Sequence, residues 1–267
     1  MKMAAQIGVL WRMATARMPT KWGMFRATGF EREFVNGVQR VETALAVVMG
    51  DLTQGVPLLR IHSQCFTGEA LGSLRCDCAD QLGMALQAIA EEGRGLVIYD
   101  YQEGRGIGLM AKLQAYELQD VGIDTVEANH ALGFKADCRD FSLPAAILRD
   151  LGVSRVRLLT NNPAKARALS DAGIEVVARI PCEAAPSQYS LAYLQTKKEK
   201  MGHMLSIRQD ESTDQTGNSP ASDSLKLKAG GTASDVVDLR RIDQDHMVDF
   251  SWRARGIEVQ LLGKAST

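Results

Sequence analysis

Residues 95–108 of this 267-residue chain read Gly95-Leu-Val-Ile-Tyr-Asp-Tyr-Gln-Glu-Gly-Arg-Gly-Ile-Gly108. The first five residues are a short apolar run, which is typical of a buried strand. A glycine-rich loop follows at residues 102–108 and leads into a predicted helix over residues 109–120, which ends near Gly122. A strand, a glycine-rich loop and a helix in this order predict one unit of a sheet covered by helices.

The patterns on both sides of this stretch predict more elements of the same kind. Residues 56–61 predict a buried strand that delivers Arg60, His62 and Cys65 to its carboxyl end, and residues 80–92 predict a helix. Further strands are predicted within residues 22–30, 41–49, 156–159 and 174–180, and further helices over residues 141–151, 161–171 and 191–205. This alternation of strands and helices predicts an α/β fold.

Composition divides the chain into four parts. We expect residues 1–20 to form a loosely ordered leader and residues 21–205 to form the main domain. Residues 206–224 are rich in Ser, Thr, Asp, Gln, Asn and Gly, which predicts a disordered linker. Residues 225–267 are a short C-terminal extension of unknown role, in which residues 249–252 and 256–261 can form a small hairpin.

The overall charge and the cysteine count limit the classes of protein to consider. The formal net charge is -1, so no global basic field favours nucleic acid. No apolar run is long enough to span a bilayer. The five cysteines are an odd number and three of them cluster, which fits a reducing cytoplasm better than a disulfide framework.

The three clustered cysteines, Cys65, Cys76 and Cys78, have the spacing C-x10-C-x-C. Three thiolates suit zinc, and a catalytic zinc keeps three protein ligands and leaves the fourth position to water. His62 is either a fourth ligand or a neighbour of the metal. Two other interpretations are buried apolar thiols and a redox pair. A bridge between Cys76 and Cys78 would be strained because one residue separates them.

Several other stretches carry residues that suit a phosphate or a nucleotide. The glycine-rich loop lacks the Walker A and Rossmann spacings, but its backbone N–H groups and Arg105 suit an anion; a plain turn with a solvated arginine explains it as well. Asp137 and Arg139 would face the same side of an extended segment, although such a pair is most often a surface ion pair. Residues 160–165 join a strand end to a helix start, which suits a phosphate or a purine edge, or simple capping.

Two residue types are expected to be structural when they are considered alone. Tyr116 lies on an amphipathic helix, where the default is a core or half-buried position. We expect His130 and His203 to be structural rather than metal ligands.

Taken together, these stretches resemble the GTP cyclohydrolase II family, which opens riboflavin biosynthesis. The resemblance runs in order from about residue 18 to residue 205, and several independent motifs in register make it specific. The motifs that carry it are residues 60–65 with 67–68, 74–78, 102–109, 124–130, 137–140, 158–163, 196–197 and 200–203. The resemblance implies a layered mixed β-sheet covered by helices, and a cytoplasmic homodimer.

The resemblance also implies a reaction and a set of site residues. GTP would be hydrolysed to formate, pyrophosphate and 2,5-diamino-6-(5-phosphoribosylamino)pyrimidin-4-one. Zinc on Cys65, Cys76 and Cys78 would activate water for attack on C8 of guanine, with His62 as a neighbour, and Tyr116 would assist. Magnesium would accompany the phosphates. The residues expected to hold the nucleotide are Arg60, Ile61, His62, Ser63, Gln64, Gln81, Glu103, Gly104, Arg105, Thr125, Thr160 and Lys165.

The resemblance leaves the role of Arg139 open. It implies a nucleophile on the α-phosphorus with Asp137 as its base, but arginine is hard to deprotonate, so charge stabilisation is an equally physical role. Tyr101 stands where the family commonly has Arg, and residues 181–190 lack the usual Asn-Pro-x-Asn pattern. One alternative is a specialised paralogue that acts on another purine nucleotide or stops at a formamidopyrimidine. Another is a nucleotide-binding regulatory protein with a structural zinc.

Overall fold

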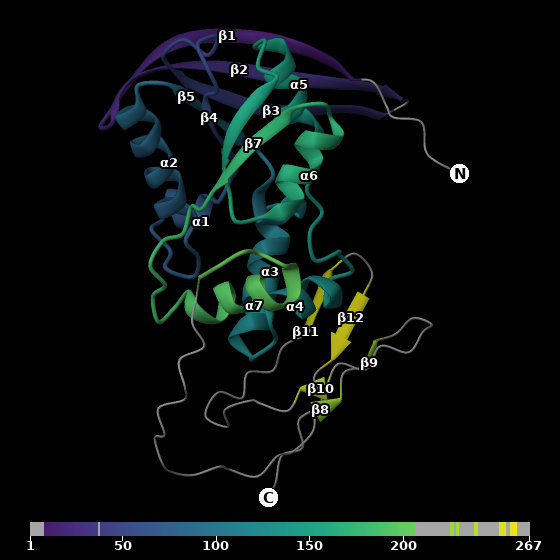
Figure 1. The fold of residues 1–267 in the computed structure, drawn as a ribbon. Helices are drawn as coiled ribbons and strands as arrows, with labels where there is room; N and C mark the ends of the chain where they lie inside the picture. The colour runs from purple at the N-terminus through teal and green to yellow at the C-terminus, as the bar shows by residue number, and fades with distance from the viewer. Residues whose placement is uncertain are drawn as a thin grey trace, which may run out of the picture.

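A mixed seven-stranded sheet forms the centre of the main domain, with the strand order β1-β2-β3-β5-β4-β6-β7 (Figure 1). The computed structural model describes residues 8–36 and 38–206, together with short strands between residues 225 and 260. The first four strands in the sheet order pair antiparallel, and β5, β4, β6 and β7 pair parallel. The strands are β1 (Val9–Thr20), β2 (Gly23–Asn36), β3 (Val38–Met49), β4 (Leu58–Ser63), β5 (Gly95–Asp100), β6 (Arg155–Leu159) and β7 (Glu175–Ile180). The predicted α/β class with a layered mixed sheet is confirmed.

Helices cover both faces of this sheet, and α3, α4 and α7 gather at the end of the molecule away from β1 (Figure 1). The helices are α1 (Phe66–Glu69), α2 (Cys78–Glu92), the 3-10 turn η1 (Glu103–Gly106), α3 (Leu109–Asp120), α4 (Thr125–Ala131), α5 (Ser142–Asp150), α6 (Pro163–Asp171) and α7 (Leu191–Met201). The predicted helix over residues 191–205 is too long, because Gly202 takes a left-handed conformation (φ 65°) and ends α7.

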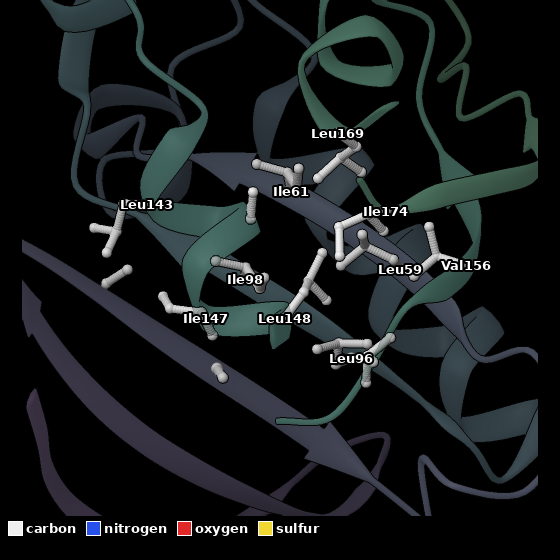
Figure 2. Packing of buried hydrophobic residues seen from close by; sticks show 14 of the residues in the cluster. Leu59, Ile61, Leu96, Ile98, Leu143, Ile147, Leu148, Val156, Leu169 and Ile174 are labelled. Atoms are coloured by element: carbon white, nitrogen blue, oxygen red, sulfur yellow. The ribbon is translucent and has the colours of Figure 1, made fainter. Parts of the chain in front are cut away.

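Alternation along the buried strands supplies the two faces with apolar side chains. Leu59 and Ile61 of β4 point into a cluster with α5 and α6, which Figure 2 shows from close by. Leu58, next to Leu59, belongs instead to a cluster with Ala85 and Ile89 of α2. This period of two is what a strand buried on both faces requires, so helices must cover each side.

The first strand corrects the prediction of a loosely ordered leader. Val9–Thr20 forms β1, which pairs antiparallel with β2; residues 1–7 lie outside the described part of the chain. A tight turn joins the two strands, since the hydroxyl of Thr20 donates to the carbonyl of Gly23 at 2.9 Å and accepts from the Trp22 N–H at 3.2 Å. Most β1 side chains are exposed, so β1 lacks the apolar alternation that would predict a strand.

The C-terminal extension contributes the strands β8 (Leu225–Lys226), β9 (Lys228–Ala229), β10 (Asp238–Leu239), β11 (Ser251–Ala254) and β12 (Ile257–Gln260). β11 pairs antiparallel with β12. β12 lies within the predicted segment 256–261, whereas β11 only overlaps the predicted segment 249–252, at Ser251 and Trp252. The predicted linker lies almost entirely outside the described residues. None of the helices in the described part is both long and apolar enough to cross a membrane.

Candidate active site

One pocket at the carboxyl ends of the parallel strands brings together nearly all of the residues that the sequence predicts for the site. This edge of a sheet is where α/β folds generally bind ligands. The predicted residues that line the pocket are Arg60, His62, Ser63, Gln64, Cys65, Cys76, Cys78, Gln81, Glu103, Gly104, Arg105, Tyr116, Thr125, Arg139, Thr160 and Lys165. Ile61 lies in the core instead, and Asp137 stands behind Arg139.

The three clustered cysteines lie together at one end of the pocket. The sulfur atoms of Cys65, Cys76 and Cys78 all lie within 4.8 Å of one another, and those of Cys65 and Cys76 are 3.5 Å apart. Tetrahedral zinc with Zn–S bonds of about 2.3 Å would place its sulfur ligands about 3.8 Å apart. The three thiols are not joined in disulfides. The donor set and its spacing therefore fit zinc.

Gly68 leaves the space between the thiols open. A Cβ at this position would lie 3.2 Å from the sulfur of Cys65 and 3.1 Å from that of Cys76, closer than ordinary contact. Any other residue at position 68 would push into the space that an ion needs. Gly68 belongs to the short helix α1, which directly follows Cys65.

His62 lines the same pocket as the thiols, and its Nε2 faces a carboxylate. Its Nε2 is 2.9 Å from Oε1 of Glu69, which also accepts the N–H of Cys65 at 2.8 Å. Oε2 of Glu69 accepts the hydroxyl of Tyr99 at 2.6 Å, and the ring of Tyr99 stacks on that of His62. Burial lowers the pKa of His62 to about 4, so the neutral ring donates to Glu69 and orients the backbone at Cys65.

Six cationic side chains line the pocket: Lys112 and Lys197, which are described below, and Arg60, Arg105, Arg139 and Lys165. Nε of Arg139 donates to Oδ1 of Asp137 at 2.9 Å and its Nη2 donates to Oδ2 at 2.5 Å. The Arg139 side chain is 10% exposed, so this pair is not the surface ion pair that the sequence alone favours. Burial raises the pKa of Asp137, but the bond from Arg139 outweighs it and lowers the pKa overall.

Lys165, like Arg60, is a buried cation of this group. It is 5% exposed, and its Nζ donates to the carbonyl of Ile61 at 2.9 Å. Burial lowers the pKa of Lys165 well below its usual range, and the charges of Arg139 and Arg60 act in the same direction. An anion in the pocket would relieve this repulsion.

The glycine-rich loop places Arg105 against the segment that carries Asp137 and Arg139. Arg105 has a φ of 61°, a left-handed conformation that is rare outside glycine and frequent at functional sites. Gly106 packs so closely on Cys138 that a Cβ would lie 3.0 Å from its carbonyl oxygen. The N–H of Cys138 donates to the carbonyl of Arg105 at 3.0 Å. The loop is therefore a shaped part of the site rather than a solvated turn.

Comparison with known proteins identifies the family of this chain. The model of the family described as GTP cyclohydrolase II matches residues 11–181. The chain belongs to the GTP cyclohydrolase II family. A Shewanella amazonensis protein named GTP cyclohydrolase-2 is 52% identical over 195 residues, which are 73% of this chain and 93% of that protein. A protein of the same name from Shigella boydii is 54% identical over 195 residues, covering 73% of this chain and 97% of that one.

Among solved structures, the chain is similar to a two-domain 3,4-dihydroxy-2-butanone 4-phosphate synthase, RibBX, from A. baumannii. The two share 20% identity with a TM-score of 0.37 over 66% of this chain and 40% of that one, a likeness too distant to carry an argument. The resemblance to GTP cyclohydrolase II that the sequence motifs indicate is thus confirmed by the family match and by the relatives.

Lys112 and Lys197 contact residues 65–78, the segment that carries the three clustered cysteines. The set of site residues taken from the sequence leaves both lysines out. Nζ of Lys112, on α3, lies 3.2 Å from the sulfur of Cys65 and 2.7 Å from Oε1 of Glu103. Burial lowers the pKa of Lys112, but Glu103 and Cys65 raise it overall, so the ammonium stays charged. Nζ of Lys197, on α7, donates to Oδ1 of Asp77 at 3.1 Å.

Asp77 connects the cysteine-bearing segment, residues 65–78, to the residues expected to hold the nucleotide. Its Oδ2 accepts the side-chain amide of Gln81, whose carbonyl oxygen accepts Nη2 of Arg60. The chain of bonds therefore runs from Lys197 to Arg60 across the pocket wall. Helical lysines usually stay in water, so their spacing in the sequence gives no signal for this role. The resemblance motif at residues 196–203 is the signal that could have identified Lys197.

Proposed function

We propose that this member of the GTP cyclohydrolase II family performs its reaction with zinc held by Cys65, Cys76 and Cys78. The substrate is GTP, and the products are formate, pyrophosphate and 2,5-diamino-6-(5-phosphoribosylamino)pyrimidin-4-one. The observation that carries the proposal is that a three-thiol group and the cations Arg60, Arg105, Arg139 and Lys165 face the same pocket. The thiols suit the metal, and the cations suit a triphosphate.

Zinc bound to the thiols would act as a Lewis acid and lower the pKa of a water molecule, which is the chemistry that attack on C8 of guanine requires. The residues around the thiols support this use. Lys112 and Glu103 form a buried ion pair at Cys65, and Oε2 of Glu103 also accepts the N–H of Phe66 at 2.7 Å. This pair fixes the loop that carries the first cysteine.

Tyr116 is placed to assist at the same end of the pocket. Its hydroxyl lies 3.4 Å from Oγ1 of Thr67, and the guanidinium of Arg75 lies 4.7 Å from the centre of its ring. Burial raises the pKa of Tyr116, so the phenol keeps its proton near neutral pH. We assign to it a hydrogen bond to the substrate as the imidazole ring opens.

Arg139 acts, in this proposal, as a charge stabiliser at the α-phosphate. Burial lowers its pKa, but the two bonds to Asp137 raise it overall, which keeps the guanidinium protonated. A protonated guanidinium is not a nucleophile, and it offers a fork that matches phosphate oxygens. Arg60, Arg105 and Lys165 add positive charge, and a magnesium ion accompanies the phosphates as a hard cation.

Product analysis tests the proposal. Purified protein is incubated with GTP and Mg²⁺, and formate, pyrophosphate and the pyrimidine are measured by mass spectrometry. We expect all three in equal amounts. A product equal to GTP plus water that retains the formyl group would favour the formamidopyrimidine alternative, and tight GTP binding without any product would favour a regulatory protein.

The departure at Tyr101 does not favour another substrate. Tyr101 is 47% exposed and packs edge-on against Tyr99, with ring centres 5.5 Å apart, and it is not among the described residues that line the pocket. We also propose the homodimer and the cytoplasmic location that the family resemblance implies. Sedimentation equilibrium of the purified protein tests the dimer.

A further inference from the structure

The turn after α7 carries a histidine that belongs to the pocket. Gly202 ends the helix, and the next residue, His203, donates its N–H to the carbonyl of Lys197 at 3.1 Å. The N–H of Met204 then donates to the carbonyl of Asn161 at 2.9 Å. His203 is therefore held at two points, against α7 and against the segment between β6 and α6, and its ring lines the pocket.

Nε2 of His203 is buried and has no hydrogen-bond partner within the protein. In the described part of the chain, five buried side-chain nitrogens share this property, and four of them belong to residues that line the pocket: Arg60, His62, Arg105 and His203. Buried polar groups are normally paired. Nδ1 of His62 is an acceptor because its Nε2 donates to Glu69, whereas the unpaired nitrogens of Arg60, Arg105 and His203 can donate, so the pocket suits a ligand that accepts hydrogen bonds.

The charges around His203 indicate the sign of that ligand. Burial, together with the charges of Lys197, Arg139, Lys165 and Arg105, lowers the pKa of His203 to about 3. The ring is therefore neutral at pH 7 and can present Nε2–H as a donor. Two of these cations already have acidic partners, because Asp77 binds Lys197 and Asp137 binds Arg139. The group that fits this space is an anion.

We propose that His203 is a substrate-binding residue that donates Nε2–H to a phosphate oxygen of the nucleoside triphosphate, beside Arg105. The inference rests on the proposed function and adds to it a contact from α7. Arg105 shares the same surroundings: its guanidinium lies 5.3 Å from the centre of the Tyr193 ring, and Nη2 is one of the unpaired donors. Together the two residues offer one neutral and one charged donor to the same group.

Inhibition of the holoenzyme by parts of the substrate tests this contact. His203→Ala should raise the KM for GTP and the inhibition constant of inorganic triphosphate by about fivefold to tenfold, the worth of one ordinary hydrogen bond. The inhibition constant of guanosine should not change, because guanosine lacks phosphate. His203→Gln should restore most of the loss, since its side-chain N–H reaches the position of Nε2.

Two variants separate a phosphate contact from a structural role. His130 is exposed on α4, so His130→Ala is the matched control and should leave all constants unchanged. If His203→Ala does not fold, His203→Asn replaces it, because asparagine places its N–H near Nδ1 and should lose affinity while glutamine keeps it. Equal weakening of guanosine and triphosphate, or no change in either, would overturn the proposal.

The His203 contact can be tested even if the proposed function is wrong. Calorimetry of GTP binding to the same variants needs no turnover. If the wild type releases no formate yet His203→Ala binds GTP fivefold to tenfold more weakly, the contact stands and the reaction does not. If formate is released normally and GTP affinity is unchanged in His203→Ala, the contact is wrong and the reaction stands.

Discussion

The two ends of the pocket differ in whether their charged groups are paired within the protein. At the thiol end, formed by Cys65, Cys76 and Cys78, the surrounding groups are paired within the protein: Lys112 binds both Cys65 and Glu103. At the cation end, formed by Arg60, Arg105, Arg139 and Lys165, two donor nitrogens have no partner and Lys165 has only a carbonyl. The thiol end therefore suits a metal cation, and the cation end suits an anion.

Under the proposed function, each end has its own chemical step. A metal held by thiols suits hydrolysis at a carbon atom, whereas fixed guanidinium and ammonium groups suit hydrolysis at the α-phosphorus, where water attacks and pyrophosphate leaves. If the assignment is right, substitutions at the thiol end should act on formate release, and those at the cation end should act on pyrophosphate release. The predictions below test that division, from the largest expected effect to the smallest.

Replacing one thiol should have the largest effect. Cys76→Ser removes a soft ligand from the predicted zinc site, so we expect zinc content near zero and formate release reduced by more than about a thousandfold. Formate is measured with a coupled dehydrogenase, and zinc by plasma emission. Cys138→Ser, at an exposed thiol, is the control and should retain both. Normal formate release from zinc-free Cys76→Ser would exclude a catalytic metal.

Arg139→Lys should have the next largest effect, at the other end of the pocket. Lysine keeps the charge but lacks the fork that binds both oxygens of Asp137, so we expect pyrophosphate release to fall by about 10²- to 10³-fold with zinc content unchanged. Pyrophosphate is followed by a pyrophosphatase-coupled phosphate assay. The control, Arg155→Lys, alters a surface ion pair with Glu175 and should behave as wild type. Zinc loss in Arg139→Lys would mean that the two ends are not separate.

Lys112→Met should have an intermediate effect that is confined to the thiol end. Removing the ammonium takes away the donor to Cys65 and leaves Glu103 buried without its cation, and such outer contacts are typically worth about 10- to 100-fold in metal affinity. Competition with a chromogenic chelator measures zinc affinity. Lys135→Met, at an exposed position, should leave it unchanged. Unchanged affinity in Lys112→Met would show that the pair only fills space.

The two ends also differ in how far the sequence predicts them. The thiols come from one stretch of 14 residues, so their spacing alone indicates a metal site. The cations come from β4, η1, the segment before α5, and α6, and only the fold brings them together. Each of these cations, taken alone, also has a purely structural explanation. The family resemblance, rather than the local sequence pattern, identifies each one as a site residue.

The same reasoning explains which parts of the fold were missed. The bounds of α3 match the prediction because its limits follow from a glycine-rich start and a glycine near its end. β1 was missed because its side chains are mostly exposed and leave no period of two. α4 did have a usable signal: the side chain of Asp124 accepts the N–H groups of Val126 and Glu127, the capping arrangement that an acidic residue three positions before a glutamate indicates.

Asp100, behind the cation end, should give the smallest effect on the reaction and a measurable effect on stability. It is 2% exposed at the end of β5, and burial raises its pKa to about 6. Because the folded pKa is above the unfolded value near 3.8, the folded state binds more protons between these values. Stability should therefore fall as pH rises from 4 to 7, by about 1–3 kcal/mol.

Asp100→Asn isolates this contribution. The amide oxygen can still accept the bond from Gln102 but carries no charge, so the difference in unfolding free energy between the variant and wild type should grow in favour of the variant as pH rises from 4 to 7. Urea unfolding at several pH values measures it. A flat difference across this range would mean that nearby Lys165 and Arg139 fully neutralise Asp100. In that case the cation end would carry less free positive charge for a triphosphate than its four side chains suggest.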